Sequence, residues 1–280
     1  HSISAFCNAG FDILGTTDHT FVSLTGYSRN IWLNIVIMLL IILGGIGFLT
    51  WEDFYTNKFK FKRYRMQSKV ILITTAILII APAVFFFACD FGNLPAGKRL
   101  LASVFQSVTT RTAGFNTEDL SLMTEAGKAV MILLMLIGGS PSSTAGGMKT
   151  TTFAVLILNA LATFRSREDA GAFGRRFDGQ VVKNAATIAM MYFMLFFFGG
   201  ITISVYEGLP LLTCLYEAAS AVGTVGLTLG ITPELHIISR LILIALMYLG
   251  RVGGMTLIYA VFSRKNNNGA KMPLEKITVG

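Results

Sequence analysis

The chain has 280 residues, of which 53% are hydrophobic and 14% are charged, and its formal net charge is +8. Its mean hydropathy of +0.64 lies well above that of a soluble domain, so the lipid bilayer is the expected solvent. The basic residues are confined to a few loops. This distribution is better explained by the orientation of a membrane protein than by nucleic-acid binding. The cysteines, Cys7, Cys89 and Cys214, lack metal-ligand spacing, so neither a disulfide framework nor a cysteine metal site is predicted.

Five apolar runs are long enough to cross about 30 Å of hydrocarbon, which takes about 20 residues. In chain order they are Ile31–Thr50, Val70–Cys89, Ala129–Asn159, Ala185–Val205 and Ile237–Phe262. The sequence therefore predicts an all-α integral membrane protein.

Basic and acidic loops alternate between these runs. The basic segments are 58–69, 165–183 and 264–276, and the mixed or acidic ones are 90–99, 116–128 and 207–217. Because cytoplasmic loops carry an excess of Lys and Arg, we expect the basic loops and the C-terminus in the cytoplasm. The other loops are expected on the outer side of a cell membrane.

A short motif occurs three times. Short apolar segments lead into the turns Asn-Ala-Gly-Phe, Thr-Ala-Gly-Phe and Thr-Val-Gly-Leu, whose glycines, Gly10, Gly114 and Gly226, are 104 and 112 residues apart. These segments have about 10 residues, too few to cross a bilayer, so each is expected to re-enter from the outer face. The order spanning helix, re-entrant loop, spanning helix predicts repeats related by rotation about a central axis.

The composition of these turns indicates a cation site. Irregular backbone is tolerated at membrane depth only where it is buried in protein or lines water. Glycine permits positive φ, so consecutive carbonyls can point to one side, and converging carbonyls can replace the hydration shell of an alkali cation. The half-helix before each turn adds a partly negative C-terminal end. The predicted cation-binding residues are Asn8, Ala9, Gly10, Phe11, Thr112, Ala113, Gly114, Phe115, Thr224, Val225, Gly226 and Leu227.

The three turns resemble the selectivity-filter loops of the Trk/Ktr/HKT superfamily of potassium transporters, most closely those of the bacterial Ktr membrane subunit. The resemblance implies a pseudo-fourfold pore of four repeats with K+ at the filter. The first repeat and the leading helix of the second would be missing from this chain. Residues 1–68 would then belong to the second repeat, 69–180 to the third, 181–264 to the fourth, and 265–280 to a cytoplasmic tail. Sodium is a second candidate ion, because each loop has one filter glycine where potassium channels have two.

A polar stretch interrupts the third apolar run. Leu136–Phe153 contains four glycines, a proline and a cluster of hydroxyls, which do not suit a lipid-facing helix. A kink stabilised by Ser and Thr is one interpretation, whereas the resemblance implies an intramembrane gating loop under the filter. The residues of the predicted loop are Gly138, Gly139, Ser140, Pro141, Ser142, Ser143, Thr144, Ala145, Gly146, Gly147, Met148 and Lys149.

Charged residues near these features carry further expectations. Arg251 lies about 14 residues into the last run, where a charge is costly unless it is paired or hydrated. It either snorkels to the cytoplasmic face or, as the resemblance implies, acts at the pore constriction by repelling cations or pairing with the loop. Arg111 is expected to point away from the ion path and bind backbone or carboxylates. The acidic residues just outside the turns either concentrate cations there or are solvated loop charges: Asp12, Asp18, Glu118 and Asp119.

Other functions are weighed against this one. The three histidines, His1, His19 and His236, fall on the predicted outer side, so a catalytic serine has no base and no enzyme is predicted. The chain lacks a phosphate-binding fingerprint, so nucleotide control would come from a partner. The resemblance implies a homodimer seated on a cytoplasmic ring of regulatory subunits that bind ATP or ADP. An alternating-access secondary transporter for a cation is the alternative, although its repeats are usually inverted.

Overall fold

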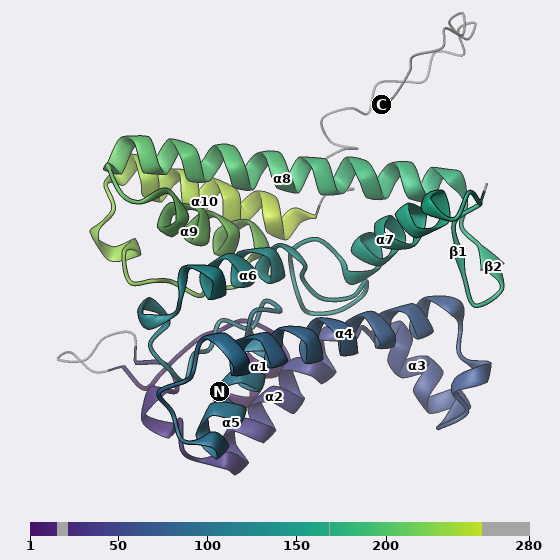
Figure 1. Ribbon diagram of the computed structural model, residues 1–280, viewed down its shortest axis with the longest axis horizontal. Helices are drawn as coiled ribbons and strands as arrows, with labels where there is room; N and C mark the ends of the chain where they lie inside the picture. The colour runs from purple at the N-terminus through teal and green to yellow at the C-terminus, as the bar shows by residue number, and fades with distance from the viewer. Residues whose placement is uncertain (16–21, 168, 254–280) are drawn as a thin grey trace, which may run out of the picture.

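The structure, a computed structural model, describes residues 1–15, 22–167 and 169–253. Figure 1 shows a helical molecule with one small hairpin, β1 (Gly171–Ala172) and β2 (Arg175–Arg176), which pair antiparallel between α7 and α8. The helical fold class is therefore confirmed. The α-helices are α1 (Ser2–Phe6), α2 (Ile31–Gly45), α3 (Phe48–Asn57), α4 (Met66–Cys89), α5 (Ala96–Thr109), α6 (Glu125–Leu136), α7 (Thr150–Phe164), α8 (Gly179–Glu207), α9 (Leu211–Gly223) and α10 (Ile237–Val252). Single turns of 3-10 helix cover Thr25–Tyr27, Phe61–Arg63, Leu120–Leu122 and Thr232–Glu234.

Local sequence signals account for several helix boundaries. Asn30, Thr124 and Asp178 cap the N-termini of α2, α6 and α8, each accepting a hydrogen bond from a first-turn backbone N–H. Pro95 and Pro210 immediately precede the short helices α5 and α9, where a missing N–H costs nothing. Gly208, in the left-handed conformation, ends α8.

Two helices of the described residues, α4 and α8, are each long and apolar enough to cross a membrane. A third crossing is possible if α2 and α3 count as one span, but these helices meet at an angle of 96°. The predicted run Ile31–Thr50 is therefore wrong as a straight helix. Its helix ends at Gly45 and the chain turns at Gly47, where φ is +87°.

The other two predicted runs also differ from single long helices. The run Ala129–Asn159 is divided into α6 and α7 by the polar residues 137–149. The run Ile237–Phe262 is helical to Val252, and its end lies outside the described residues, as do the C-terminal tail and Asp18.

The short helices pack in a recurring way. α5 packs against α4, which precedes it, and against α2. α9 likewise packs against α8, which precedes it, and against α6. In turn, α1 packs on α2 and α9 packs on α10. Each of α5 and α9 thus lies between the long helix before it and a helix from the preceding part of the chain.

The basic loops meet at one end of the molecule. In Figure 1 the hairpin β1–β2 and helix α3, which leads into the basic loop 58–69, both lie at the right. Lys69 places its Nζ 5.7 Å from the ring centre of Phe173 in the hairpin. Both loops that the charge pattern assigns to the cytoplasm are therefore on the same side of the fold.

Candidate functional site

The three glycine turns share one backbone conformation. In each turn the polar residue is left-handed, with φ of +48° at Asn8, +64° at Thr112 and +52° at Thr224. The glycine two residues later is also left-handed, with φ of +69° at Gly10, +79° at Gly114 and +89° at Gly226. Non-glycine residues rarely adopt positive φ, so the three turns share an uncommon backbone conformation at matching positions.

The turns also meet in space, although they are more than a hundred residues apart in the sequence. A Cβ built on Gly10 would lie 2.9 Å from the carbonyl oxygen of Ala113, and one built on Gly114 would lie 2.5 Å from that of Val225. A Cβ on Gly226 would lie 3.7 Å from Cα of Gly114. The fold therefore brings the predicted cation-binding turns to one place, with backbone carbonyls beside the glycines.

A cavity of about 300 Å³ lies against the three turns and is lined by Gly10, Gly114 and Gly226. Asp12 and Asp119 also line it. Asp12 is held by the backbone N–H groups of Leu14 and Ser23 and by His1. Two of the carboxylates predicted to lie near the mouth are thus at this cavity.

Glu118, the third described carboxylate of that group, is engaged elsewhere. Its Oε1 pairs with Lys98 Nζ at 2.8 Å. It is absent from the cavity lining, so its charge is shared with a lysine rather than presented to the cavity.

Side chains of the short helices hold each turn. Ser4 Oγ accepts from the backbone N–H of Phe11 at 2.8 Å, and Thr109 Oγ1 donates to the carbonyl oxygen of Phe115 at 2.5 Å. In the third turn the buried Glu217 carboxylate accepts from the Thr228 hydroxyl at 2.7 Å. It also accepts from the Leu229 backbone N–H at 2.9 Å and from the Thr232 hydroxyl at 2.8 Å.

The sequence analysis missed Glu217. The available signal was a single charge in a short apolar segment, since Glu217 is the one acidic or basic residue of Leu211–Gly223. An ionisable side chain inside a membrane segment is a functional hypothesis by default. Its three hydrogen bonds fix the chain just after Leu227.

Residues 137–149 form a closed loop between α6 and α7. Ile137 and Met148 form a parallel bridge, and the N–H of Gly138 donates to the carbonyl of Met148 at 2.8 Å. Beyond the bridge, Ser140 Oγ and Thr150 Oγ1 are 3.0 Å apart and share a hydrogen bond. The loop is therefore an ordered structure rather than a simple helix kink.

The loop is bound to the break between α2 and α3. The N–H of Ser140 donates to the carbonyl of Gly45, and the N–H of Phe48 donates to that of Ser142, both at 2.9 Å. A Cβ on Gly47 would overlap the carbonyl oxygen of Pro141. The loop supplies hydrogen-bond partners for the backbone groups that the break leaves unpaired, so the two irregular segments stabilise each other.

Thr144, near the middle of the loop, touches the first turn. Its Oγ1 accepts from Asn8 Nδ2 at 3.1 Å and lies 3.0 Å from the carbonyl oxygen of Phe6. On the other side of the loop, a Cβ on Gly146 would overlap Thr224 Oγ1 of the third turn. The loop therefore contacts two of the three glycine turns directly.

Two cationic side chains bind the loop. Arg251 Nη1 donates to the carbonyl of Thr144 at 3.1 Å, and Lys149 Nζ donates to that of Ala145 at 2.7 Å. In the described part of the chain neither takes part in an ion pair. The contact of the exposed Arg251 agrees with one of its predicted roles, pairing with the loop, and its action at a pore constriction stays a prediction.

Arg111 behaves differently from expectation. It is 5% exposed, and among the described residues its Nε and Nη2 have no hydrogen-bond partner. The backbone or carboxylate partner predicted for it is therefore not found at these two atoms within that part of the chain.

Comparison with known proteins identifies the family. Residues 1–269 match the family described as "TrkH: Cation transport protein". The chain belongs to the TrkH family. The family consists of cation transporters rather than enzymes, and the apolar helices agree with a multi-pass membrane protein.

Named members of the TrkH family are similar over the whole chain. It is 39% identical to the potassium/sodium uptake protein NtpJ of Enterococcus hirae and 34% identical to the Ktr system potassium uptake protein B of Bacillus subtilis. The alignments cover all of this chain but only 63% and 62% of the length of those two proteins. The chain thus spans just over three fifths of their length.

A solved structure shows the same fold. The crystal structure of the potassium transporter TrkH from Vibrio parahaemolyticus superposes with a TM-score of 0.75 at 18% identity. The match covers 93% of this chain and 57% of that one.

Proposed function

We propose that this chain forms most of a channel-like pore for potassium uptake, with the three glycine turns as parts of its selectivity filter. The convergence of Gly10, Gly114 and Gly226 carries the proposal. Carbonyls held around an axis bind a dehydrated alkali cation. The relatives' names, potassium uptake and potassium/sodium uptake, agree with potassium as the ion and leave sodium as a second one.

The repeats fit a pseudo-fourfold pore from which one quarter lies outside this chain. Phe115 and Leu227, at the fourth positions of their turns, are 0% and 3% exposed, whereas Phe11 at the same position is 75% exposed. The matching contacts of α5 and α9, each with the long helix before it and with a helix from the preceding part of the chain, support such a repeat. A fourth turn would fill the open side beside Phe11.

The loop 137–149 is proposed to be the gate. Thr144 binds the first turn, and Arg251 binds the carbonyl of the same residue. These contacts support a position of the loop across the proposed ion path, under the proposed filter. Moving it requires these hydrogen bonds to break, together with those of Ser140 and Ser142 at the break between α2 and α3. The positive charges of Arg251 and Lys149 oppose cation passage while the loop is in place.

Partners and orientation follow from the family resemblance and the charge pattern. The basic loops at the end with α3 and the hairpin are proposed to face the cytoplasm, which leaves the cavity at Asp12 and Asp119 outside. A homodimer is proposed to sit on a cytoplasmic ring of regulatory subunits that bind ATP or ADP and control the loop.

Growth rescue tests the transport proposal. Cells without their own potassium uptake systems should grow at low potassium when they express the transporter, and growth should increase with the regulatory subunit. Accessibility of introduced cysteines separates the pore from alternating access. Gly10→Cys and Ser140→Cys should be modified independently in a pore, whereas strictly alternate modification would indicate an alternating-access transporter.

A further inference from the structure

One methionine sulfur links the two short helices that lead into the second and third glycine turns. Gln106 of α5 donates from Nε2 to Sδ of Met131 at 3.3 Å, and Tyr216 of α9 donates from its hydroxyl to the same sulfur at 3.7 Å. Met131 belongs to α6, which packs along α9, whereas α5 packs on α4 and α2. Side chains from three helices therefore meet at this one atom.

The three side chains lie in the interior of the protein. Met131 and Tyr216 are 0% exposed and Gln106 is 1% exposed. A buried N–H or O–H group without an acceptor destabilises the folded state, and a thioether sulfur is a weak acceptor that can serve both donors. Within the described residues, the Gln106 amide and the Tyr216 hydroxyl donate to no other acceptor. Leucine would fill a similar space but leave both donors unpaired.

Each donor is close to a residue that holds a glycine turn. Three residues after Gln106, Thr109 donates its hydroxyl to the carbonyl oxygen of Phe115 in the second turn. Directly after Tyr216, Glu217 accepts the hydrogen bonds that fix the chain just after the third turn. A shift of either short helix would therefore move the turn that it carries.

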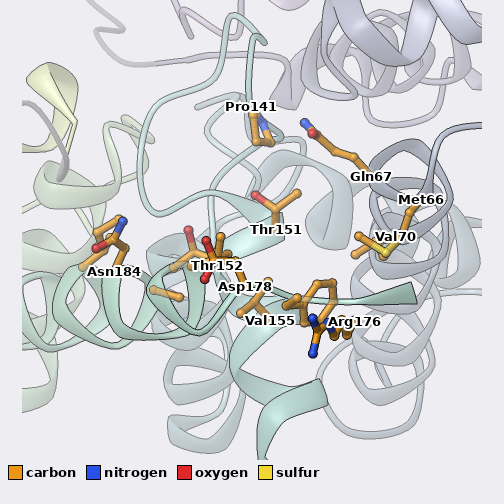
Figure 2. A pocket seen from close by; sticks show the side chains of 14 residues that line it. Met66, Gln67, Val70, Pro141, Thr151, Thr152, Val155, Arg176, Asp178 and Asn184 are labelled. Atoms are coloured by element: carbon orange, nitrogen blue, oxygen red, sulfur yellow. The ribbon is translucent and has the colours of Figure 1, made fainter. Parts of the chain in front are cut away.

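The packing of this cluster differs from that beside the loop 137–149. Figure 2 shows a pocket of about 520 Å³ between α4, α7 and α8, with Pro141 of the loop among its lining side chains. The loop thus borders open space, whereas Gln106, Met131 and Tyr216 are enclosed by protein. Close packing resists small displacements, so the cluster suits a fixed part of the structure rather than a moving one.

We infer that Met131 is a positioning residue for the second and third turns, because its sulfur fixes α5 and α9 relative to each other. The inference rests on the proposed function of these turns as parts of a selectivity filter. The two turns approach closely, since a Cβ on Gly114 would lie 2.5 Å from the carbonyl oxygen of Val225. Coordination of a dehydrated cation depends on where the carbonyl oxygens lie, so losing the link should lower the preference for potassium over sodium.

Replacing the sulfur by carbon tests this inference. The purified transporter with Met131→Leu would be reconstituted into vesicles, and the uptake of rubidium and of sodium would be measured. The ratio of rubidium to sodium uptake is expected to fall about fivefold. Met135→Leu is the matched control, because Met135 lies on the same helix and is also 0% exposed, but its sulfur accepts no hydrogen bond within the described chain. Its ratio should be unchanged.

Two further variants separate positioning from stability. Tyr216→Phe removes one donor without leaving an N–H or O–H group unpaired, so the fold is retained and the ratio should fall about twofold. The triple variant Met131→Leu, Gln106→Leu, Tyr216→Phe has neither donor. Its melting temperature in detergent should recover relative to Met131→Leu, while its uptake ratio should stay low.

Three results would overturn the inference: an equal ratio in Met131→Leu and Met135→Leu, an unchanged ratio in Tyr216→Phe, or a ratio that recovers with the melting temperature in the triple variant. Gly114→Ala distinguishes this failure from failure of the filter. If Gly114→Ala lowers the ratio and Met131→Leu does not, only the role of Met131 is wrong. An unchanged ratio in both variants would remove the proposed filter as well.

Discussion

The side-chain amide of Asn8 donates to the hydroxyl of Thr144 at 3.1 Å, across 136 residues of sequence. The same hydroxyl lies 3.0 Å from the carbonyl oxygen of Phe6 at the end of α1. One side chain of the loop thus binds both the first glycine turn and the short helix before it. This contact gives the proposed gate a physical link to the proposed filter.

Replacing the Thr144 hydroxyl should loosen the loop. Thr144→Val keeps the shape but leaves Asn8 Nδ2 without its acceptor, at a cost of about 1–3 kcal/mol for an unsatisfied buried donor. We expect potassium flux without the regulatory subunit to rise about tenfold, measured as rubidium uptake into vesicles. Ser143→Ala is the control, because Ser143 Oγ has no hydrogen-bond partner within the described chain. Equal flux in the two variants would remove Thr144 from the gate.

Arg251 should restrain the same loop from the other side. Arg251→Ala removes both the bond to the Thr144 carbonyl and a positive charge at the proposed ion path. Rubidium uptake without the regulatory subunit should therefore increase several-fold, because the loop loses about 1 kcal/mol or more of hydrogen-bond stabilisation. The matched control is Arg240→Ala. It lies on the same helix but donates to the carbonyl of Pro233. If Arg251→Ala lowered uptake, or if both variants raised it alike, the assignment would be wrong.

The three turn glycines should differ in their sensitivity to a side chain. In Gly114→Ala the new Cβ lies 2.5 Å from the Val225 carbonyl oxygen at a φ of +79°. The left-handed conformation alone costs about 1–2 kcal/mol for a non-glycine residue. We expect the potassium-to-sodium uptake ratio to fall about tenfold, equivalent to about 1.4 kcal/mol of differential binding.

Two further substitutions calibrate that effect. Gly226→Ala should lower the ratio less, because the nearest atom to its Cβ is 3.7 Å away. Gly97→Ala, in α5 with no atom within 4 Å, should leave the ratio unchanged. A reversed order of Gly114 and Gly226 would show that these turns are not held as the structure has them.

Glu217 should stabilise the third turn through its charge. Glu217→Gln keeps the size but weakens three hydrogen bonds to a carboxylate, which are worth about 1.5–3 kcal/mol each when charged. We expect a lower melting temperature in detergent and a reduced potassium-to-sodium ratio. The exposed Glu234→Gln should change neither. An unaltered ratio in Glu217→Gln would limit Glu217 to a role in stability.

Much of this arrangement was predictable because it repeats. Gly10, Gly114 and Gly226 stand in similar four-residue contexts, so one local signal was available three times. Residues 137–149 were likewise marked by composition, because glycine, proline and hydroxyl residues do not form a lipid-facing helix.

What escaped prediction depends on distant contacts. The run Ile31–Thr50 is apolar throughout most of its length, and its break is stabilised by Ser140 and Ser142 about a hundred residues later. The bonds of Glu217 form only when residues 228–232 fold back over α9. Neither contact leaves a periodic pattern in the sequence.

The most direct test of the central claim is to locate a bound ion in crystals of the protein grown with thallium(I), which mimics potassium and scatters anomalously. An anomalous peak is predicted among the glycine turns, close to the carbonyl oxygens of Ala113 and Val225 and beside Gly10. Thallium bound elsewhere in the membrane region, with none at these turns, would contradict the proposal that they form the filter.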